Sequence, residues 1–159
     1  MSAAILNVPA STGETRDQTQ DQAQILALID SVRQAHHVKD AAGIAAPYAP
    51  HAVIYDLEPP LSHHGISVER KRKWLDTWDT GIDLETRDLE LTIDGSHAFA
   101  HGFLRMRGAK VGAERAIDFW MRVTFCFERV NGAWRIAHEH HSVPFYMDGS
   151  LRPAFDLQP

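Results

Sequence analysis

Several features that mark familiar protein classes are absent from this sequence. Its single cysteine, Cys126, excludes an internal disulfide and favours a reducing cytoplasm. No stretch approaches the roughly 18 apolar residues that a membrane-spanning helix needs, and no secretory signal is evident. The 16 Lys and Arg residues are spread among 21 Asp and Glu residues, which argues against nucleic-acid binding. A Gly-rich phosphate loop and a nucleophile elbow are also lacking, so we expect no cofactor and no acyl-enzyme chemistry.

The composition that remains predicts one globular domain. The chain has 159 residues, of which 44% are hydrophobic and 23% are charged, the usual balance for a single packed core. Residues 1–20 are polar and lack periodicity, which predicts a flexible tail before a single domain over 21–159. From 21 to 40, Ile25, Ile29 and Val32 recur at helical spacing and predict a long amphipathic helix.

The rest of the chain predicts an α+β fold. A short helix over 41–46, a strand over 52–56, a turn at His63-His64-Gly65 and a helix capped by Ser67 come first. Four strands follow, at about 83–93, 96–107, 114–129 and 133–143. Asp94-Gly95 and Asn131-Gly132 favour the positive φ angles of tight hairpins. We therefore expect a strongly curved antiparallel sheet wrapped around the long N-terminal helix, with one deep cavity.

The closing segment resembles a known superfamily. Residues 131–144, NGAWRIAHEHHSVP, with Arg122-Val-Thr124 in the preceding strand, resemble SnoaL-like, ketosteroid-isomerase-like domains, above all their uncharacterised ketosteroid isomerase homologues. The similarity covers about 21–157. It implies a conical barrel with a deep cavity, commonly a homodimer packed through the outer face of the sheet.

The resemblance also implies a position for a catalytic base. In ketosteroid isomerases an aspartate ends the first strand, before a proline-containing loop and a glycine that opens the next helix. The segment Val53-Ile-Tyr-Asp56, followed by residues 58–65, has this layout, which places Asp56 at the base position. The oxyanion-hole tyrosine of those enzymes has no clear counterpart in the first helix, and their protonated aspartate cannot be placed. Steroid isomerisation is therefore not implied.

The last strand supplies further candidates for the pocket wall. Side chains alternate across a strand, so Trp134, Ile136, His138, His140 and Ser142 share one face. We expect that face to line the cavity, because its apolar beginning changes to imidazoles and a hydroxyl, as a core grading into a pocket would. The alternative is that His138 and His140 are hydrogen-bonded core residues without a role in binding.

Neighbouring strands add possible partners whose orientation stays open. His101 lies on one face of its strand, and Trp120 and Arg122 share a face of the next, although a β-bulge would invert either assignment. Arg122 would pair with Asp118 or Asp56, bind a substrate carboxylate or enolate, or form a surface salt bridge. The opposite face is so apolar that a helix or a partner must bury it; its residues are Phe119, Met121, Val123, Phe125 and Phe127.

The remaining candidates surround Asp56. Tyr55 precedes it, and Trp78 is expected in the core or the cavity roof. Asp56 itself has a plain alternative as a solvated turn residue before a proline-containing loop. His138, His140, His101 and Asp56 offer a conceivable metal cluster, which we discount because a His-x-His pair is weak evidence among ten histidines.

These residues predict a cofactor-independent proton-transfer enzyme for a small apolar carbonyl or hydroxyl compound. Asp56 would act as base, His140 and His138 as acid or orienting groups, and Arg122 as charge stabiliser. Isomerisation, dehydration and cyclisation all fit this scheme. The rival hypothesis is a non-catalytic domain that binds a small organic acid or metabolite, since fold does not fix function. A third possibility is an assembly module whose sheet face binds another protein.

Overall fold

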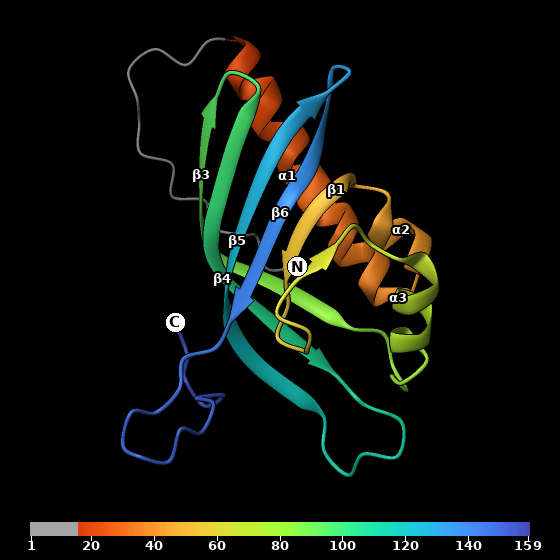
Figure 1. Cartoon of the computed structure of the whole chain (residues 1–159), viewed down its shortest axis with the longest axis vertical. Coiled ribbons are helices and arrows are strands. Elements are labelled where there is room, and N and C mark those ends of the chain that lie inside the picture. Colours follow the sequence, from red (N-terminus) through yellow and green to blue (C-terminus); the bar gives the residue numbers. More distant parts are fainter. Residues whose placement is uncertain (1–15) are drawn as a thin grey trace.

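The computed structural model describes residues 16–159, in which a long helix lies in the concave face of a curved sheet (Figure 1). The first elements are α1 (Arg16–His37), α2 (Ala41–Ala45), β1 (Tyr48–Tyr55), β2 (His63–His64) and α3 (Val68–Leu75). Four long strands complete the chain: β3 (Asp83–Asp94), β4 (His97–Gly108), β5 (Ile117–Val130) and β6 (Ala133–Ser142). Most of the predicted tail, residues 1–15, lies outside the described residues. No helix within 16–159 is long and apolar enough to cross a membrane.

The helices form where their local signals predict them. The apolar stripe of α1 is buried, with Ile25, Ile29 and Val32 each at most 6% exposed, although the helix begins at Arg16 rather than near residue 21. Ser67 caps α3, as predicted, because its side chain accepts a hydrogen bond from the backbone N–H of Arg70 at 3.2 Å. α2 and α3 pack together at one end of the sheet (Figure 1).

The six strands form one open sheet in the order β2-β1-β6-β5-β4-β3, antiparallel except for the β1–β6 pair. Both predicted hairpins are present. Asn131 and Gly132 have φ angles of 51° and 83°, and Gly95 has a φ of 59°. The α+β class is confirmed, but β2 and β3 remain edges, so the curved sheet does not close into a barrel.

The sequence left open whether a helix or a partner protein buries the apolar face of β5, and the packing of the structure answers this. Phe119, Met121, Val123, Phe125 and Phe127 are each at most 8% exposed. They join the stripe of α1 in one hydrophobic core, so the helix buries this face within the chain. The apolar face of β5 therefore needs no partner protein to cover it.

A bulge in β6 changes which side chains face inward. Phe127 of β5 lies opposite Ile136, but the preceding Cys126 lies opposite His138, so Ala137 is an extra residue in β6. Before the bulge, Ile136 points into the core. After it, Glu139 and His141 point inward, because one inserted residue reverses the alternation of a strand.

Candidate active site

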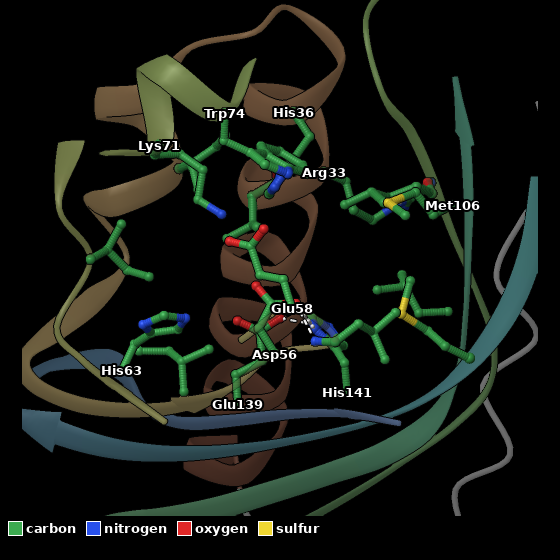
Figure 2. Close-up of a pocket in the computed structure, with 18 of the residues that line it drawn as sticks. Arg33, His36, Asp56, Glu58, His63, Lys71, Trp74, Met106, Glu139 and His141 are labelled. Carbon is green, nitrogen blue, oxygen red and sulfur yellow. Dashed lines mark hydrogen bonds and ion pairs between the residues drawn. The ribbon is translucent and has the colours of Figure 1, made fainter. Parts of the chain in front are cut away.

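A cavity of about 290 Å³ opens between α1, α3 and the inner face of the sheet (Figure 2). Its walls are mostly apolar and aromatic, with Ile54, Trp74, Trp78, Leu104, Met106 and Phe125 among them. The volume lies near the lower end of the range for small-molecule sites. Polar side chains enter the cavity from β1, β2, β6 and α3. The candidate catalytic groups therefore lie on the wall that these elements form.

Asp56 and His141 meet because β1 and β6 are parallel neighbours. Tyr55 lies opposite His140 in the ladder. The residues that follow them, Asp56 and His141, therefore lie side by side, and both side chains line the cavity. Nδ1 of His141 lies 3.7 Å from Oδ1 of Asp56, an ion-pair distance that is too long for a hydrogen bond. Figure 2 shows the two side chains in contact at the floor of the cavity.

Two further groups extend this pair into the protein. Nε2 of His141 lies 3.0 Å from Oε1 of Glu139, and the hydroxyl of Tyr48 donates a hydrogen bond to Oε2 of the same carboxylate. Glu139 and Tyr48 are each at most 9% exposed. Asp56 also accepts a hydrogen bond of 2.8 Å from the backbone N–H of Leu57, which holds the carboxylate in place. The result is a continuous polar chain, Tyr48–Glu139–His141–Asp56, in an otherwise apolar wall.

This arrangement fixes the charges of the site. Burial disfavours the charged imidazolium of His141, but the carboxylates of Glu139 and Asp56 outweigh it and raise its pKa from 6.5 to about 10. Burial likewise opposes ionisation of Asp56, yet contact with His141 keeps the pKa of Asp56 well below its ordinary value. The pKa of Glu139 is lowered against burial, mainly by the charge of His141. At neutral pH the site therefore holds two carboxylates and one imidazolium.

The opposite wall carries histidine and cationic groups. His36 of α1 is buried, and burial lowers its pKa to about 4, so its imidazole is neutral at pH 7. Its Nδ1 lies 2.8 Å from the carbonyl oxygen of Val32, which fixes the ring on the helix. Lys71 of α3 places its ammonium 4.6 Å from the ring centre of Trp74, and Figure 2 shows it above Asp56 and Glu58.

The structure places two of the predicted site residues at the cavity, namely Asp56 and Trp78. The others do not line it: Tyr55, His101, Trp120, Arg122, His138, His140 and Ser142. Ladder pairs show why. His101 and His140 both lie opposite Thr124, and Phe103 and Ser142 both lie opposite Arg122, so these side chains share the outer face of the sheet. The expectation that they form the pocket wall is wrong in this geometry.

The bulge at Ala137 explains the error on β6. Strict alternation from Trp134 and Ile136 led to His138 and His140, whereas the extra residue turns Glu139 and His141 inward instead. His138 is a half-buried residue whose Nδ1 lies 2.7 Å from the carbonyl oxygen of Val53, close to the hydrogen-bonded alternative. The adjacent apolar pair Ile136-Ala137, which breaks the alternation, was the available signal for the bulge.

Other expectations also change in the structure. Arg122 is exposed, and it is Arg105 that pairs with Asp118, through two hydrogen bonds of 2.7 and 2.9 Å. His63-His64, expected as a turn, forms strand β2 and brings His63 into the cavity. Among residues 16–159, no group of three or more His, Cys, Asp or Glu side chains is arranged to hold a metal ion.

An open cone of sheet around a helix, with ionised groups along one wall of an apolar cavity, defines a small-molecule pocket domain of the α+β class. The chain belongs to the SnoaL-like domain family, whose sequence profile matches residues 25–146. Comparison with curated proteins finds no significant match.

Solved structures agree on the fold. An NTF2-like protein of unknown function from Pseudomonas putida is 29% identical, with a TM-score of 0.77 over 89% of this chain and 98% of that one. A putative scytalone dehydratase from Novosphingobium aromaticivorans is 11% identical, with a TM-score of 0.69 over 85% and 91% of the two chains. A putative dehydratase of the NTF2-like family from Streptomyces avermitilis is 12% identical, with a TM-score of 0.65 over 78% and 96%. At these lower identities the likeness concerns the fold alone.

Proposed function

We propose that this protein is a cofactor-independent proton-transfer enzyme that dehydrates or isomerises a small, largely apolar carbonyl compound. The observation that carries the proposal is the ionised pair of Asp56 and His141 in an apolar cavity. The ionised carboxylate of Asp56 can accept a proton as a general base, and the imidazolium of His141 can donate one as a general acid. The names of two structural neighbours, both putative dehydratases, are in keeping with this class of reaction.

In the proposed dehydration, Asp56 removes a proton from the carbon next to the carbonyl group, and the electron pair moves into an enolate. The enolate then expels the hydroxyl group from the adjacent carbon, and His141 gives that oxygen its proton, so that water leaves. Proton transfer from Asp56 to His141 restores the resting ion pair. Isomerisation uses the first step alone, after which Asp56 returns its proton to a different carbon.

The two groups are coupled in a way that favours this order. Asp56 is one of the charges that hold the proton on His141. When Asp56 becomes neutral by taking the substrate proton, that attraction disappears and the pKa of His141 falls. The imidazolium therefore becomes a stronger acid at the step where the leaving hydroxyl group needs a proton.

The test is exchange of substrate hydrogens with solvent. We would incubate the protein in D2O with cyclohexanone, 2-cyclohexenone and 4-hydroxy-2-butanone, and follow the α-hydrogen signals and alkene formation by NMR. Asp56→Asn should reduce exchange by about 100-fold or more, while affinity for the same compounds changes by a few fold at most. Equal loss of both, or no exchange with any compound, would favour the rival hypothesis of a non-catalytic binding domain.

Adjacent histidines provide a matched control. His141→Gln removes the acid and should abolish alkene formation from 4-hydroxy-2-butanone. His140→Gln alters the neighbouring residue on the outer face and should leave the rate within about twofold. The opposite result would restore the assignment of His140 as the catalytic histidine.

The proposal includes a cytoplasmic homodimer. The single cysteine supports the location, and the family resemblance supports a dimer through the outer face of the sheet. On that face the side chains of Tyr55 and Phe99 are each more than two-fifths exposed, and a partner subunit would cover them. Sedimentation velocity at micromolar concentration should give a dimer, and a strict monomer would count against it.

A further inference from the structure

His63 is a buried side chain in the cavity with one nitrogen left unpaired. It lies on β2 directly opposite Ile54 of β1, and both side chains face inward. Asp56 is two residues beyond Ile54 on the same face. Diagonal neighbours of this kind are separated by roughly 7–8 Å, close enough for one small molecule to touch both. Figure 2 shows the imidazole of His63 beside the cavity, on the side facing Asp56.

Arg70 determines which nitrogen of His63 carries the proton. Nη1 of Arg70 lies 2.7 Å from Nδ1 of His63. A guanidinium group only donates hydrogen bonds, so Nδ1 must accept, and the proton of the neutral ring is on Nε2. Arg70 is itself held in the first turn of α3, where its backbone N–H donates to the capping side chain of Ser67.

The Nε2–H group of His63 is then a donor of fixed direction. Within residues 16–159 it has no hydrogen-bond partner, although His63 is only 7% exposed. Buried polar groups in native proteins are normally paired, so an unpaired one calls for an explanation, and a role in binding or catalysis is one such explanation. The fold thus keeps an N–H group of His63 in the cavity wall with no acceptor among residues 16–159.

We propose that Nε2–H of His63 donates a hydrogen bond to the carbonyl oxygen of the substrate and stabilises the enolate that forms when Asp56 removes the adjacent proton. This role rests on the proposed function, and it identifies His63 as the group that polarises the substrate carbonyl. No proton leaves His63 during the step, because a neutral imidazole stabilises the oxyanion as a hydrogen-bond donor. Arg70 is a positioning residue that holds the tautomer. The substrate must therefore present an oxygen acceptor one carbon away from the acidic C–H bond.

The first experiment uses the native chain and requires no turnover. Two-bond ¹H–¹⁵N correlation spectra of the ¹⁵N-labelled protein should show His63 as the Nε2–H tautomer. Saturation with 4-nitrophenol, whose phenolate resembles an enolate, should move the Nε2–H resonance downfield. Absence of any change with high concentrations of 4-nitrophenol and of 2-cyclohexenone would overturn the assignment.

Variants then separate this inference from the proposed function. In His63→Leu, affinity for 4-nitrophenol should fall by about tenfold or more, and α-hydrogen exchange by about 100-fold. Arg70→Met should change the tautomer signal of His63 and give a smaller loss of both. A folded His63→Leu protein with unchanged affinity and exchange would refute the role of His63 while leaving Asp56 as base. Wild-type exchange rates in Asp56→Asn would refute the proposed function, whereas the spectral test of His63 would stand on its own.

Discussion

Replacing His141 with Asn should remove both stability and its alkaline pH dependence. The folded protein raises the pKa of His141 from 6.5 to about 10. A raised pKa contributes stability that is fully present below pH 6.5 and is lost as the pH rises through about 10. One pKa unit corresponds to about 1.4 kcal/mol, so the bound proton is worth about 5 kcal/mol at low pH. That is a large share of the 5–15 kcal/mol typical of a whole domain.

The assay is urea unfolding at pH 6.5 and pH 9.5. Between these values the wild-type free energy of unfolding should fall by about 4 kcal/mol because of His141, or about 2 M in midpoint for an m-value of about 2 kcal/mol/M. In His141→Asn this component should be missing, and the variant should be several kcal/mol less stable at pH 6.5, since Asp56 and Glu139 lose the charge between them.

The difference between the two proteins isolates His141, because groups that titrate elsewhere cancel. His64→Asn, an exposed position on β2, is the matched control and should follow the wild type. If wild type and His141→Asn lose the same stability between pH 6.5 and 9.5, then His141 is not an imidazolium between two carboxylates, and the charge assignment of the site is wrong.

Three further predictions concern other groups. Burial lowers the pKa of His36 to about 4, so stability should fall as the pH drops from 6.5 to 4, and His36→Asn should remove about 3 kcal/mol of that loss in acid thermal melts. Gly81→Ala should lower the unfolding free energy by about 3 kcal/mol in urea, because its Cβ would lie 1.9 Å from the carbonyl oxygen of His37; wild-type stability would contradict this packing. For alkene formation from 4-hydroxy-2-butanone, in which His141 is the acid, Glu139→Gln should move the alkaline limb of the pH profile at least one unit lower, because Glu139 raises the pKa of His141. An unmoved alkaline limb would contradict this role of Glu139.

The fold was predictable because its signals are local. The stripe of Ile25, Ile29 and Val32 specifies the central helix, and Asn131-Gly132 specifies a hairpin through backbone angles that few other residues accept. The position of Asp56 came from the resemblance to ketosteroid isomerases, and the structure places it on the cavity wall. Helices and turns that are determined by their own local sequence could therefore be predicted without the structure.

The rest of the site depends on contacts between distant segments. The bulge at Ala137 is set by how β6 fits both β5 and β1, so alternation alone gave the outer histidines instead of Glu139 and His141. Similarly, a pair of histidines before a glycine resembles a turn until β1 is present to pair with them. Tertiary pairing, rather than residue type, decided which of the ten histidines enter the cavity.

The extra residue Ala137 reverses the alternation of β6. Before it, even-numbered residues such as Ile136 face the interior, and after it the odd-numbered residues Glu139 and His141 do. Deleting this one residue would exchange the histidines shown to the cavity with those shown to the outside. In comparing relatives, a gap placed at 137 or beside it therefore decides whether His140 or His141 is aligned with a catalytic group, and strand faces are a safer guide than matching letters.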